Sequence, residues 1–187
     1  GISVLPATAF VERGLAVAQR LGLYGLEELT LERALRLPEQ GALQLQLAVG
    51  PLDETGLRPL SVYAKREEEP DEAAWTRYAS ASLRASAADP EPDEPLQVWP
   101  PEGSSEIALE DHYDVLAAAG VHYADVYRGL RAAYQREDAL FAEIALPEAL
   151  AREASAYALH PVLLDAALQV LALRPGAALQ MPFAWSG

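Results

Sequence analysis

Hydrophobic positions repeat with a helical period in two segments of the chain. Within residues 6–21, apolar side chains recur every three to four positions, and Gly22 follows at a helix-ending position. In the segment Pro161–Leu173, Leu164, Leu168 and Leu171 fall on one helical face. Proline fits the first turn of a helix, because its missing N–H needs no partner there. The sequence therefore predicts a long helix early in the chain and another late.

Alternating patterns between these segments predict strands. Hydrophobic and polar residues alternate along Leu43–Val49, which predicts a strand. The turn sequence Asp53-Glu54-Thr55-Gly56 follows and predicts a hairpin whose second strand is Leu57–Ala64. Further strands are expected at residues 29–37, 75–84, 129–136, 139–146 and 180–185, and a short helix at residues 109–119. Runs of strands and helices without regular alternation indicate an α+β fold.

Residues 85–101 differ in character from the rest. They contain the run Asp89-Pro90-Glu91-Pro92-Asp93-Glu94-Pro95, and then Pro100-Pro101. An acidic, proline-rich stretch of this kind forms neither a helix nor a central strand, and it is typical of a solvated linker. We therefore expect a first half at residues 1–84, a linker at 85–101 and a second half at 102–187.

Composition limits the classes of function. Hydrophobic residues make up 51% of the 187 residues, which is enough for a core, and the net charge is −14. The chain has no cysteine, which excludes disulfides, thiolate metal sites and cysteine nucleophiles. It also lacks a basic stripe that could meet nucleic-acid phosphates. No apolar run is long enough to span a membrane and no secretory signal is recognisable, so we expect a cytoplasmic protein.

Asp165 is the candidate for chemistry, because it is the one carboxylate in the apolar run Pro161–Leu173. A carboxylate in such a setting is either a paired charge or a proton donor whose pKa is raised by desolvation. Gln169 lies one helical turn further on, where its amide can hold the carboxyl. Two simpler explanations stay open. The helix dipole favours an Asp near a helix N-terminus, and His160 alone suits a cap or a buried imidazole.

The segment His160–Gln169, which reads His-Pro-Val-Leu-Leu-Asp-Ala-Ala-Leu-Gln, resembles a segment of the dehydratase domains of modular type I polyketide synthases. Four more segments are similar to that family in the same order, namely residues 1–12, 27–31, 75–79 and 181–187. The resemblance covers nearly the whole chain. It implies a double hot-dog fold, in which each half is a long helix wrapped by an antiparallel sheet.

The resemblance also implies an activity. Such a domain eliminates water from a (3R)-3-hydroxyacyl thioester and leaves the enoyl thioester. The substrate is carried on the phosphopantetheine of an acyl carrier protein, and no metal or redox cofactor takes part. Asp165 matches the catalytic acid of the family, and Gln169 is expected to orient it. Substrate contacts are expected at Gly1, Pro6, Tyr123, Tyr127 and His160, with core packing as the alternative for the two tyrosines.

Three departures from the family pattern accompany this match. The catalytic base of the family is a histidine four residues before the glycine that Gly1 matches. We therefore expect the sequence to be part of a larger domain, truncated at both ends and without that base. The Pro-Gly of the first motif is Pro6-Ala7 here, and the Gly-Pro of the Tyr-Gly-Pro-x-Phe segment is Ala124-Asp125.

These departures leave three functions open. They are a dehydratase, a dehydratase-like cyclase or isomerase, and a non-catalytic structural domain. The expected partners are acyl carrier protein and the other domains of a synthase, and whether the protein forms a homodimer stays open.

Overall fold

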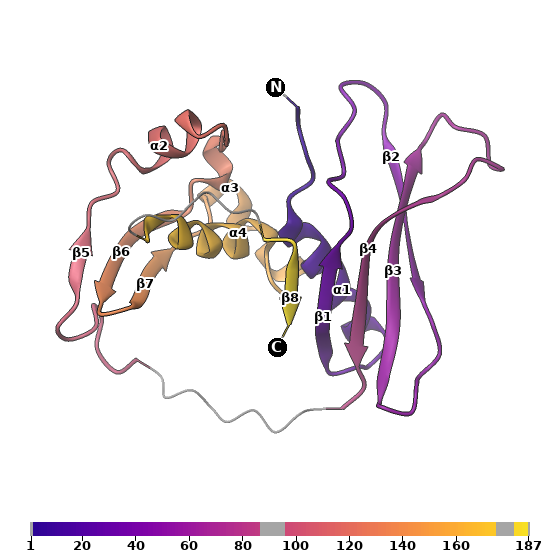
Figure 1. Cartoon of the computed structure of the whole chain (residues 1–187), viewed down its shortest axis with the longest axis horizontal. Helices are drawn as coiled ribbons and strands as arrows, with labels where there is room; N and C mark the ends of the chain where they lie inside the picture. Colours follow the sequence, from indigo (N-terminus) through magenta and orange to yellow (C-terminus); the bar gives the residue numbers. More distant parts are fainter. Residues whose placement is uncertain (1, 87–95, 175–181, 187) are drawn as a thin grey trace. The chain divides into compact units, whose positions relative to one another are not determined.

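A computed structural model describes residues 2–86, 96–174 and 182–186. The chain divides into two compact units. The first unit contains Gly1–Pro90 together with Pro182–Gly187, and the second contains Glu91–Met181. Each unit has its own antiparallel sheet with helices beside it (Figure 1). This arrangement confirms the α+β class that the sequence predicts.

The first unit is built on a five-stranded sheet with the strand order β2-β3-β4-β1-β8. Every pairing of neighbours in this sheet is antiparallel. The strands are β1 (Gly25–Leu31), β2 (Leu43–Val49), β3 (Leu57–Arg66), β4 (Thr76–Arg84) and β8 (Ala184–Ser186).

Helix α1 (Ala7–Arg20) covers one face of this sheet, where it packs against β1 and β4. Phe10 and Ala18 of α1 are buried against Leu29, Leu60 and Leu83 of the strands, and all five are at most 2% exposed. The helix therefore forms because its apolar stripe and the inner face of the sheet remove each other from water. The helix expected at residues 6–21 is confirmed.

Asp53 shapes the connection between β2 and β3. Its Oδ1 accepts hydrogen bonds from the backbone N–H groups of Thr55 and Leu57, both at 2.9 Å, and from Thr55 Oγ1 at 2.7 Å. Gly56 has a φ of 82°, a conformation that glycine adopts without strain. The hairpin turn predicted from this Asp-to-Gly sequence is confirmed.

The second unit contains a three-stranded antiparallel sheet in the order β5-β6-β7, with short helices around it. Its elements are β5 (Ser105–Ile107), α2 (His112–Ala118), η1 (Asp125–Tyr127), β6 (Leu130–Arg136), β7 (Ala139–Ile144), α3 (Glu148–Ala151), η2 (Ala154–Ala156), α4 (Pro161–Gln169) and η3 (Val170–Leu173). Helix α4 packs against β6, β7 and η1 and runs alongside the sheet (Figure 1).

The structure differs from the sequence-based expectations in the first unit. The strand expected at residues 29–37 ends at Leu31, and the chain then turns toward the N-terminal segment, where Leu5 N–H donates to the carbonyl of Leu35 at 2.8 Å. The last strand was expected in the second half, but β8 pairs with β1 and belongs to the first unit.

In the second unit, β5, α3 and η2 were not expected. Residues 87–95, in the expected linker, and residues 180–181 of the expected last strand lie outside the described residues. The boundaries of the two halves otherwise stay a prediction.

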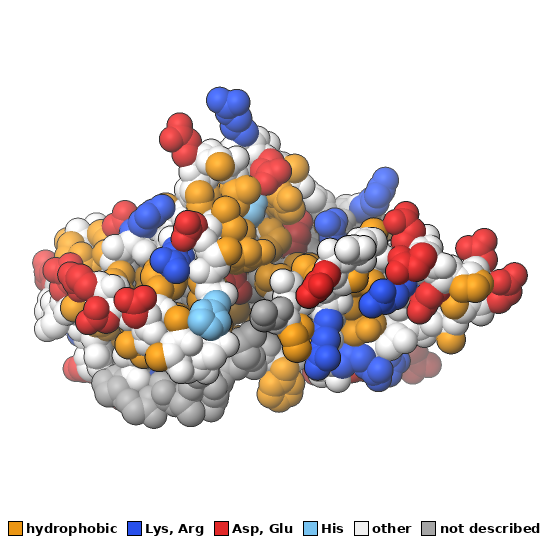
Figure 2. All heavy atoms as spheres, turned by 90° about the horizontal axis from the view of Figure 1, so that it is seen from above, with side chains coloured by type: hydrophobic (Ala, Val, Ile, Leu, Met, Phe, Trp, Pro, Cys, Tyr) orange, Lys and Arg blue, Asp and Glu red, His pale blue; other side chains and the backbone are white. Residues whose placement is uncertain are grey.

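Charge is spread unevenly along the chain. Figure 2 shows both acidic and basic side chains over the visible face. The second unit contains the arginines Arg128, Arg131, Arg136, Arg152 and Arg174 and no lysine.

Among the described residues, no helix has the length and apolar character needed to cross a bilayer.

Gly129 sets how closely β6 and α4 approach. A Cβ at this position would lie 2.9 Å from the Ala166 Cβ and 3.0 Å from the carbonyl oxygen of Ala145. The Ala166 methyl group is fully buried, and the Ala145 oxygen belongs to the main chain. Neither neighbour is therefore a flexible side-chain end that could move aside. We therefore expect Gly129→Ala to lower the free energy of unfolding by about 1–3 kcal/mol.

The measurement is denaturant unfolding followed by circular dichroism. Gly25→Ala is the matched control, because a Cβ there meets no atom within 4 Å. Equal stability of the two variants would show that the contact between Gly129 and α4 is not as close as the structure indicates.

Candidate active site

Helix α4 presents the candidate acid, and its first residues explain why the helix begins where it does. His160 is the N-cap, and its Nδ1 accepts a hydrogen bond from Val162 N–H at 3.2 Å. Pro161 follows in the first turn, where the helix needs no N–H from it. The buried face of α4 contains Val162, Ala166 and Gln169, whereas the expected leucine stripe is partly buried at Leu164 and Leu168 and exposed at Leu171. The helix expected at Pro161 is thus confirmed, with a different inner face.

Asp165 is partly buried on this helix. Burial raises the pKa of the Asp165 carboxyl above its ordinary value, and the hydrogen bond from Gln169 acts in the opposite direction. The two effects have separate physical causes. Desolvation penalises the charged form, whereas an N–H donor stabilises it. The carboxyl therefore keeps its proton to a higher pH than an exposed aspartic acid does.

The Gln169 side chain links Asp165 to two other elements. Its Nε2 donates to Asp165 Oδ2 at 3.1 Å and to the carbonyl oxygen of Tyr127 at 2.9 Å. Its Oε1 accepts a hydrogen bond from the hydroxyl of Tyr113 at 3.0 Å. The hydrogen bond between Gln169 and Asp165, which the four-residue spacing predicts, is present in the structure. The roles of both residues in chemistry stay predictions.

Three tyrosine side chains lie close enough to Asp165 for its charge to raise their pKa values. Burial raises the pKa of Tyr123 to about 12, and the charges of Asp165 and Tyr113 add to this effect. The pKa of Tyr127 is raised mainly by burial and further by Asp165, and burial is also the main cause of the raised pKa of Tyr113. All three phenols therefore keep their protons near neutral pH and can serve as hydrogen-bond donors.

His160 is buried, and its ring lies 4.5 Å from the ring of Tyr157. Because Nδ1 accepts a backbone hydrogen bond, the neutral ring carries its proton on Nε2. The Nε2 atom has no hydrogen-bond partner among the described residues. The geometry thus gives His160 a capping role, which is one of the explanations that the sequence left open. A contact with substrate stays a prediction.

Sequence reasoning missed one residue of this cluster. Tyr113 of α2 joins Gln169 and contacts Tyr123, with a distance of 6.2 Å between the two ring centroids. The structure thus brings Asp165, Gln169, Tyr123 and Tyr127 together with Tyr113 in the second unit. The only sequence signal for Tyr113 was its place in the expected helix at residues 109–119. Of the other expected site residues, Pro6 precedes α1 in the first unit, and Gly1 lies outside the described residues.

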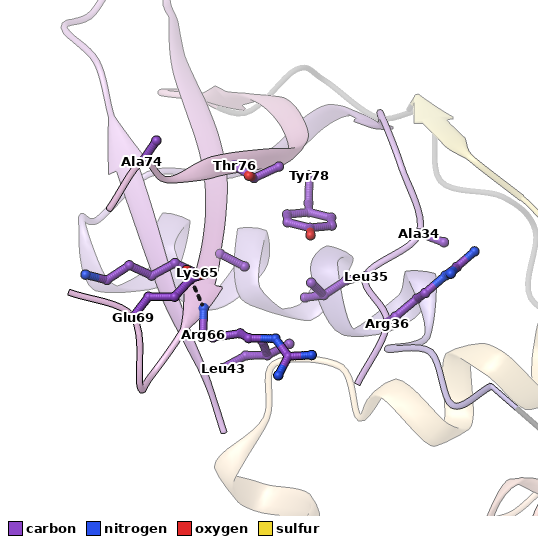
Figure 3. Close-up of a pocket in the computed structure, with 11 residues that line it drawn as sticks. Ala34, Leu35, Arg36, Leu43, Lys65, Arg66, Glu69, Ala74, Thr76 and Tyr78 are labelled. Atoms are coloured by element: carbon purple, nitrogen blue, oxygen red, sulfur yellow. Dashed lines mark hydrogen bonds between the residues drawn. The ribbon is translucent and has the colours of Figure 1, made fainter. Parts of the chain in front are cut away.

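A cavity of about 330 Å³ lies in the first unit, beside β3, β4 and residues 34–36 (Figure 3). The ring of Tyr78 points into it, whereas the Lys65 side chain points away (Figure 3). Lys65 donates to the carbonyl oxygen of Pro70 at 3.2 Å and lies 5.1 Å from the centroid of the Trp75 ring. Arg66 pairs with Glu68 at 3.3 Å. The one acid among the lining residues, Glu69, accepts a hydrogen bond from the backbone N–H of Arg66 at 3.2 Å, so the cavity has no counterpart of the Asp165 cluster.

The Asp165 cluster contains groups that can donate protons and form hydrogen bonds. Within residues 2–86, 96–174 and 182–186, no group of three or more His, Asp or Glu side chains is placed to hold a metal ion. The cluster combines one acid with a raised pKa, one amide donor and phenol hydroxyls. Such a set can donate a proton to a leaving group and stabilise the carboxylate that remains.

Comparison with known families decides what kind of domain carries this cluster. Residues 91–187 match the family described as polyketide synthase dehydratase N-terminal domain, and residues 1–65 match the polyketide synthase dehydratase domain. The chain belongs to the polyketide synthase dehydratase family. The resemblance seen in the sequence is thereby confirmed.

Individual synthases agree with this assignment. Polyketide synthase GfsE of Streptomyces halstedii is 40% identical over 193 residues, which is 100% of this chain and 5% of that protein. The pikromycin synthase component PikAII of Streptomyces venezuelae is 41% identical over 170 residues, covering 90% of this chain and 4% of that protein. The chain thus spans only a small part of the synthases that it matches.

Solved dehydratase structures show the same fold. A structure from work on dehydratase substrate selection in the borrelidin and fluvirucin synthases has a TM-score of 0.90 and 38% identity, covering 100% of this chain and 64% of that one. The erythromycin dehydratase has a TM-score of 0.87 and 36% identity, covering 100% of this chain and 66% of that one. These dehydratase domains confirm the hot-dog fold that the resemblance implies. The chain spans about two thirds of each solved chain.

The raised pKa of Asp165 has a consequence for the stability of this dehydratase-family chain. The folded state holds a proton that the unfolded state releases, so stability falls as pH rises from the ordinary value of 3.8 through the folded pKa. Asp165→Asn carries no charge. We expect this variant to unfold at a higher temperature than the wild type at pH 7, and the difference to vanish below pH 3.8.

Thermal unfolding of both proteins between pH 3 and pH 8 measures this difference. Asp138→Asn, in the exposed turn between β6 and β7, is the matched control and should not gain stability at pH 7. A difference between wild type and Asp165→Asn that stays constant over the pH range would contradict the burial effect.

Proposed function

We propose that this chain is part of a dehydratase domain that eliminates water from a (3R)-3-hydroxyacyl thioester and forms the enoyl thioester. The observation that carries the proposal is the Asp165 carboxyl, whose pKa is raised by burial and which Gln169 holds at 3.1 Å. A departing hydroxyl group needs a proton source, and a carboxyl that keeps its proton to a higher pH than an exposed aspartic acid is suited to that role. The membership of the chain in the dehydratase family supports the same reaction.

The proposed elimination uses Asp165 as the general acid. A base removes the proton from the α-carbon, and that electron pair forms the new double bond. The bond between the β-carbon and oxygen breaks, and the departing oxygen takes the proton of Asp165 and leaves as water. Asp165 ends as a carboxylate, which the Gln169 N–H stabilises. We propose that the base is a histidine at the family position four residues before the glycine that Gly1 matches.

The remaining predicted site residues are proposed to contact the substrate. Tyr123 and Tyr127 have pKa values raised by burial and by Asp165, so each hydroxyl stays protonated and can donate to an oxygen of the acyl chain or thioester. Gly1, Pro6 and His160 are proposed as substrate contacts from their motif positions alone. No metal or redox cofactor is needed, because the reaction moves only protons and one leaving group.

We propose that the substrate arrives on the phosphopantetheine of an acyl carrier protein. The relatives are synthases of polyketides such as pikromycin and spectinabilin, so the proposed context is polyketide biosynthesis beside other synthase domains. The chain has a net charge of −14, and an acidic carrier would be repelled at long range. Tethering within one assembly raises the effective concentration of the carrier and removes the need for electrostatic steering.

A second candidate is a dehydratase that also cyclises its product. The bifunctional dehydratase-cyclase domain of ambruticin biosynthesis is 37% identical with a TM-score of 0.86, covering 100% of this chain and 64% of that one. In such a reaction, a second hydroxyl of the chain adds to the new double bond and forms a cyclic ether. Ala124-Asp125, in place of the family's Gly-Pro, directly follows the proposed contact Tyr123 and is separated from Tyr127 by Val126. Mass spectrometry with a substrate that carries a second hydroxyl separates the two products.

The general-acid role predicts a graded loss of activity. In the full-length protein that contains this sequence, Asp165→Asn should reduce turnover of a model 3-hydroxyacyl thioester by ~100-fold or more, because no proton source remains. Gln169→Leu should cost less, because Gln169 orients the acid and does not donate to the substrate. Formation of the enoyl product is followed by its ultraviolet absorbance and by mass spectrometry.

Asp138→Asn is the matched control for the charge change, since Asp138 is exposed in a turn of the same unit. Near-normal turnover by Asp165→Asn would rule out the general-acid assignment. Absence of turnover in the wild-type full-length protein would instead favour a structural domain.

A further inference from the structure

We propose that Tyr113 is a positioning residue for Asp165 and acts through the side-chain amide of Gln169. The proposal rests on the proposed function only where it concerns turnover, since the hydrogen-bond chain can be tested without any reaction. Tyr113 lies on α2 and Gln169 on α4, fifty-six positions apart in sequence. Through the Tyr113 hydroxyl, α2 fixes the orientation of the Gln169 amide on α4.

The main chain determines the direction of the hydrogen bonds at the Tyr113 end. Leu130 N–H, at the start of β6, points to the Tyr113 oxygen at 3.4 Å, and an N–H group can only donate. The Tyr113 oxygen therefore accepts from Leu130, and its own proton is directed to Gln169. The atom of Gln169 that faces Tyr113 at 3.0 Å must then be the oxygen, Oε1.

The hydrogen bonds on the other side of Gln169 lead independently to the same orientation of its amide. Tyr127 contributes a backbone carbonyl, which can only accept, and it lies 2.9 Å from Gln169. The atom of Gln169 on this side must be the nitrogen, Nε2, and its second hydrogen points to Asp165 Oδ2 at 3.1 Å. Asp165 Oδ2 can therefore only accept. In the protonated form of Asp165, the proton then lies on the other oxygen, Oδ1.

Burial makes this orientation strict. Gln169 is only 3% exposed, so water cannot replace a lost partner. A flipped amide would place Oε1 against both the Tyr127 carbonyl and the Asp165 carboxyl, and would leave the Tyr113 hydroxyl facing an N–H group. The Tyr113 ring is itself held by neighbours, with centroid distances of 5.0 Å to His112 and 6.2 Å to Tyr123, and Arg128 lies 5.2 Å above it.

Removing the Tyr113 hydroxyl should therefore release the amide while leaving the ring in place. In Tyr113→Phe, Gln169 Oε1 loses its donor, and the orientation that directs Nε2 to Asp165 is no longer enforced. The Gln169 hydrogen bond is the one contribution that lowers the pKa of Asp165, so its weakening should raise that pKa. Tyr113, Tyr123 and Tyr127 stay neutral in the range of the titration. The cation beside the cluster is Arg128, 5.2 Å from the centroid of the Tyr113 ring. The His112 ring lies 5.0 Å from the Tyr113 ring, and burial lowers the pKa of His112.

The first experiment uses the 187-residue chain labelled with ¹³C at the aspartate carboxyl groups, with Asp165 assigned by its loss in Asp165→Asn. We expect the Asp165 titration to move to higher pH in Tyr113→Phe. Tyr134→Phe is the matched control, because the Tyr134 ring packs against Trp99 at 5.5 Å and the hydroxyl takes no part in the chain to Gln169, so it should leave the titration unchanged. An unchanged Asp165 titration in a folded Tyr113→Phe protein would overturn the proposal.

Two further measurements separate positioning from general structural support. If Tyr113 acts through Gln169, adding Tyr113→Phe to Gln169→Leu should not shift the Asp165 titration further, and an additive shift would overturn the proposal. In the wild-type chain, both side-chain N–H protons of Gln169 should exchange slowly with solvent. Rapid exchange of both would overturn the proposal even if the variants failed to fold.

Turnover gives the final measurement, in the full-length protein. We expect Tyr113→Phe to lower kcat about 10-fold with little change in KM, because a displaced acid affects the reaction more than binding. If Asp165→Asn abolishes turnover, an unchanged kcat in Tyr113→Phe would overturn the positioning role. If Asp165→Asn keeps its turnover while Tyr113→Phe still shifts the titration, the general-acid assignment fails and the positioning of Asp165 stands. If Asp165→Asn is inactive and the titration does not move, the positioning role fails alone.

Discussion

The side-chain cluster of the second unit depends on one constraint, which is that a partly buried carboxyl must keep a hydrogen-bond partner. Asp165 meets it with a single N–H of Gln169, and the other N–H of that amide is held by the backbone of η1. The amide oxygen in turn needs Tyr113 of α2, whose hydroxyl meets the first residue of β6. Four elements of the second unit, α2, η1, β6 and α4, are thereby connected through one side-chain amide. A change in any of them reaches the carboxyl through this amide.

Two opposing effects act on that carboxyl. Burial favours its neutral form and costs stability above the ordinary pKa of an aspartic acid, whereas the amide hydrogen bond favours the charged form and limits this cost. Replacing Asp165 by an uncharged residue relieves the first effect and removes the proposed proton donor. A site of this kind is thus kept at the expense of stability, as is common where activity needs a destabilised group. Gly129 contributes by allowing α4 to pack closely on the start of β6.

Patterns that are local in sequence predicted local structure well. The helix at residues 7–20 follows from its apolar period, the turn at Asp53 from the hydrogen-bonding capacity of its side chain, and the contact of Asp165 with Gln169 from one helical turn of spacing. Long-range partners were not predictable in this way. Nothing in the segment around Tyr113 indicates a partner near the end of α4, because that contact depends on how α2 and α4 pack. The pairing of β8 with β1 likewise depends on which sheet edge is open, which the alternation of a strand does not encode.

The pairing of β8 with β1 gives the chain the connectivity of an inserted domain. The backbone leaves the first unit after β4, forms the second unit, and returns to complete the first sheet. Residues from both ends of the sequence therefore belong to the first unit. The second unit is joined to it by two backbone connections, one after β4 and one before β8. The two connections are not equivalent toward a protease. A cut after β4 leaves no covalent bond between β1–β4 and the second unit, which then stays attached only while β8 remains paired with β1. A cut before β8 separates only the segment that contains β8 and leaves the second unit covalently attached through the other connection.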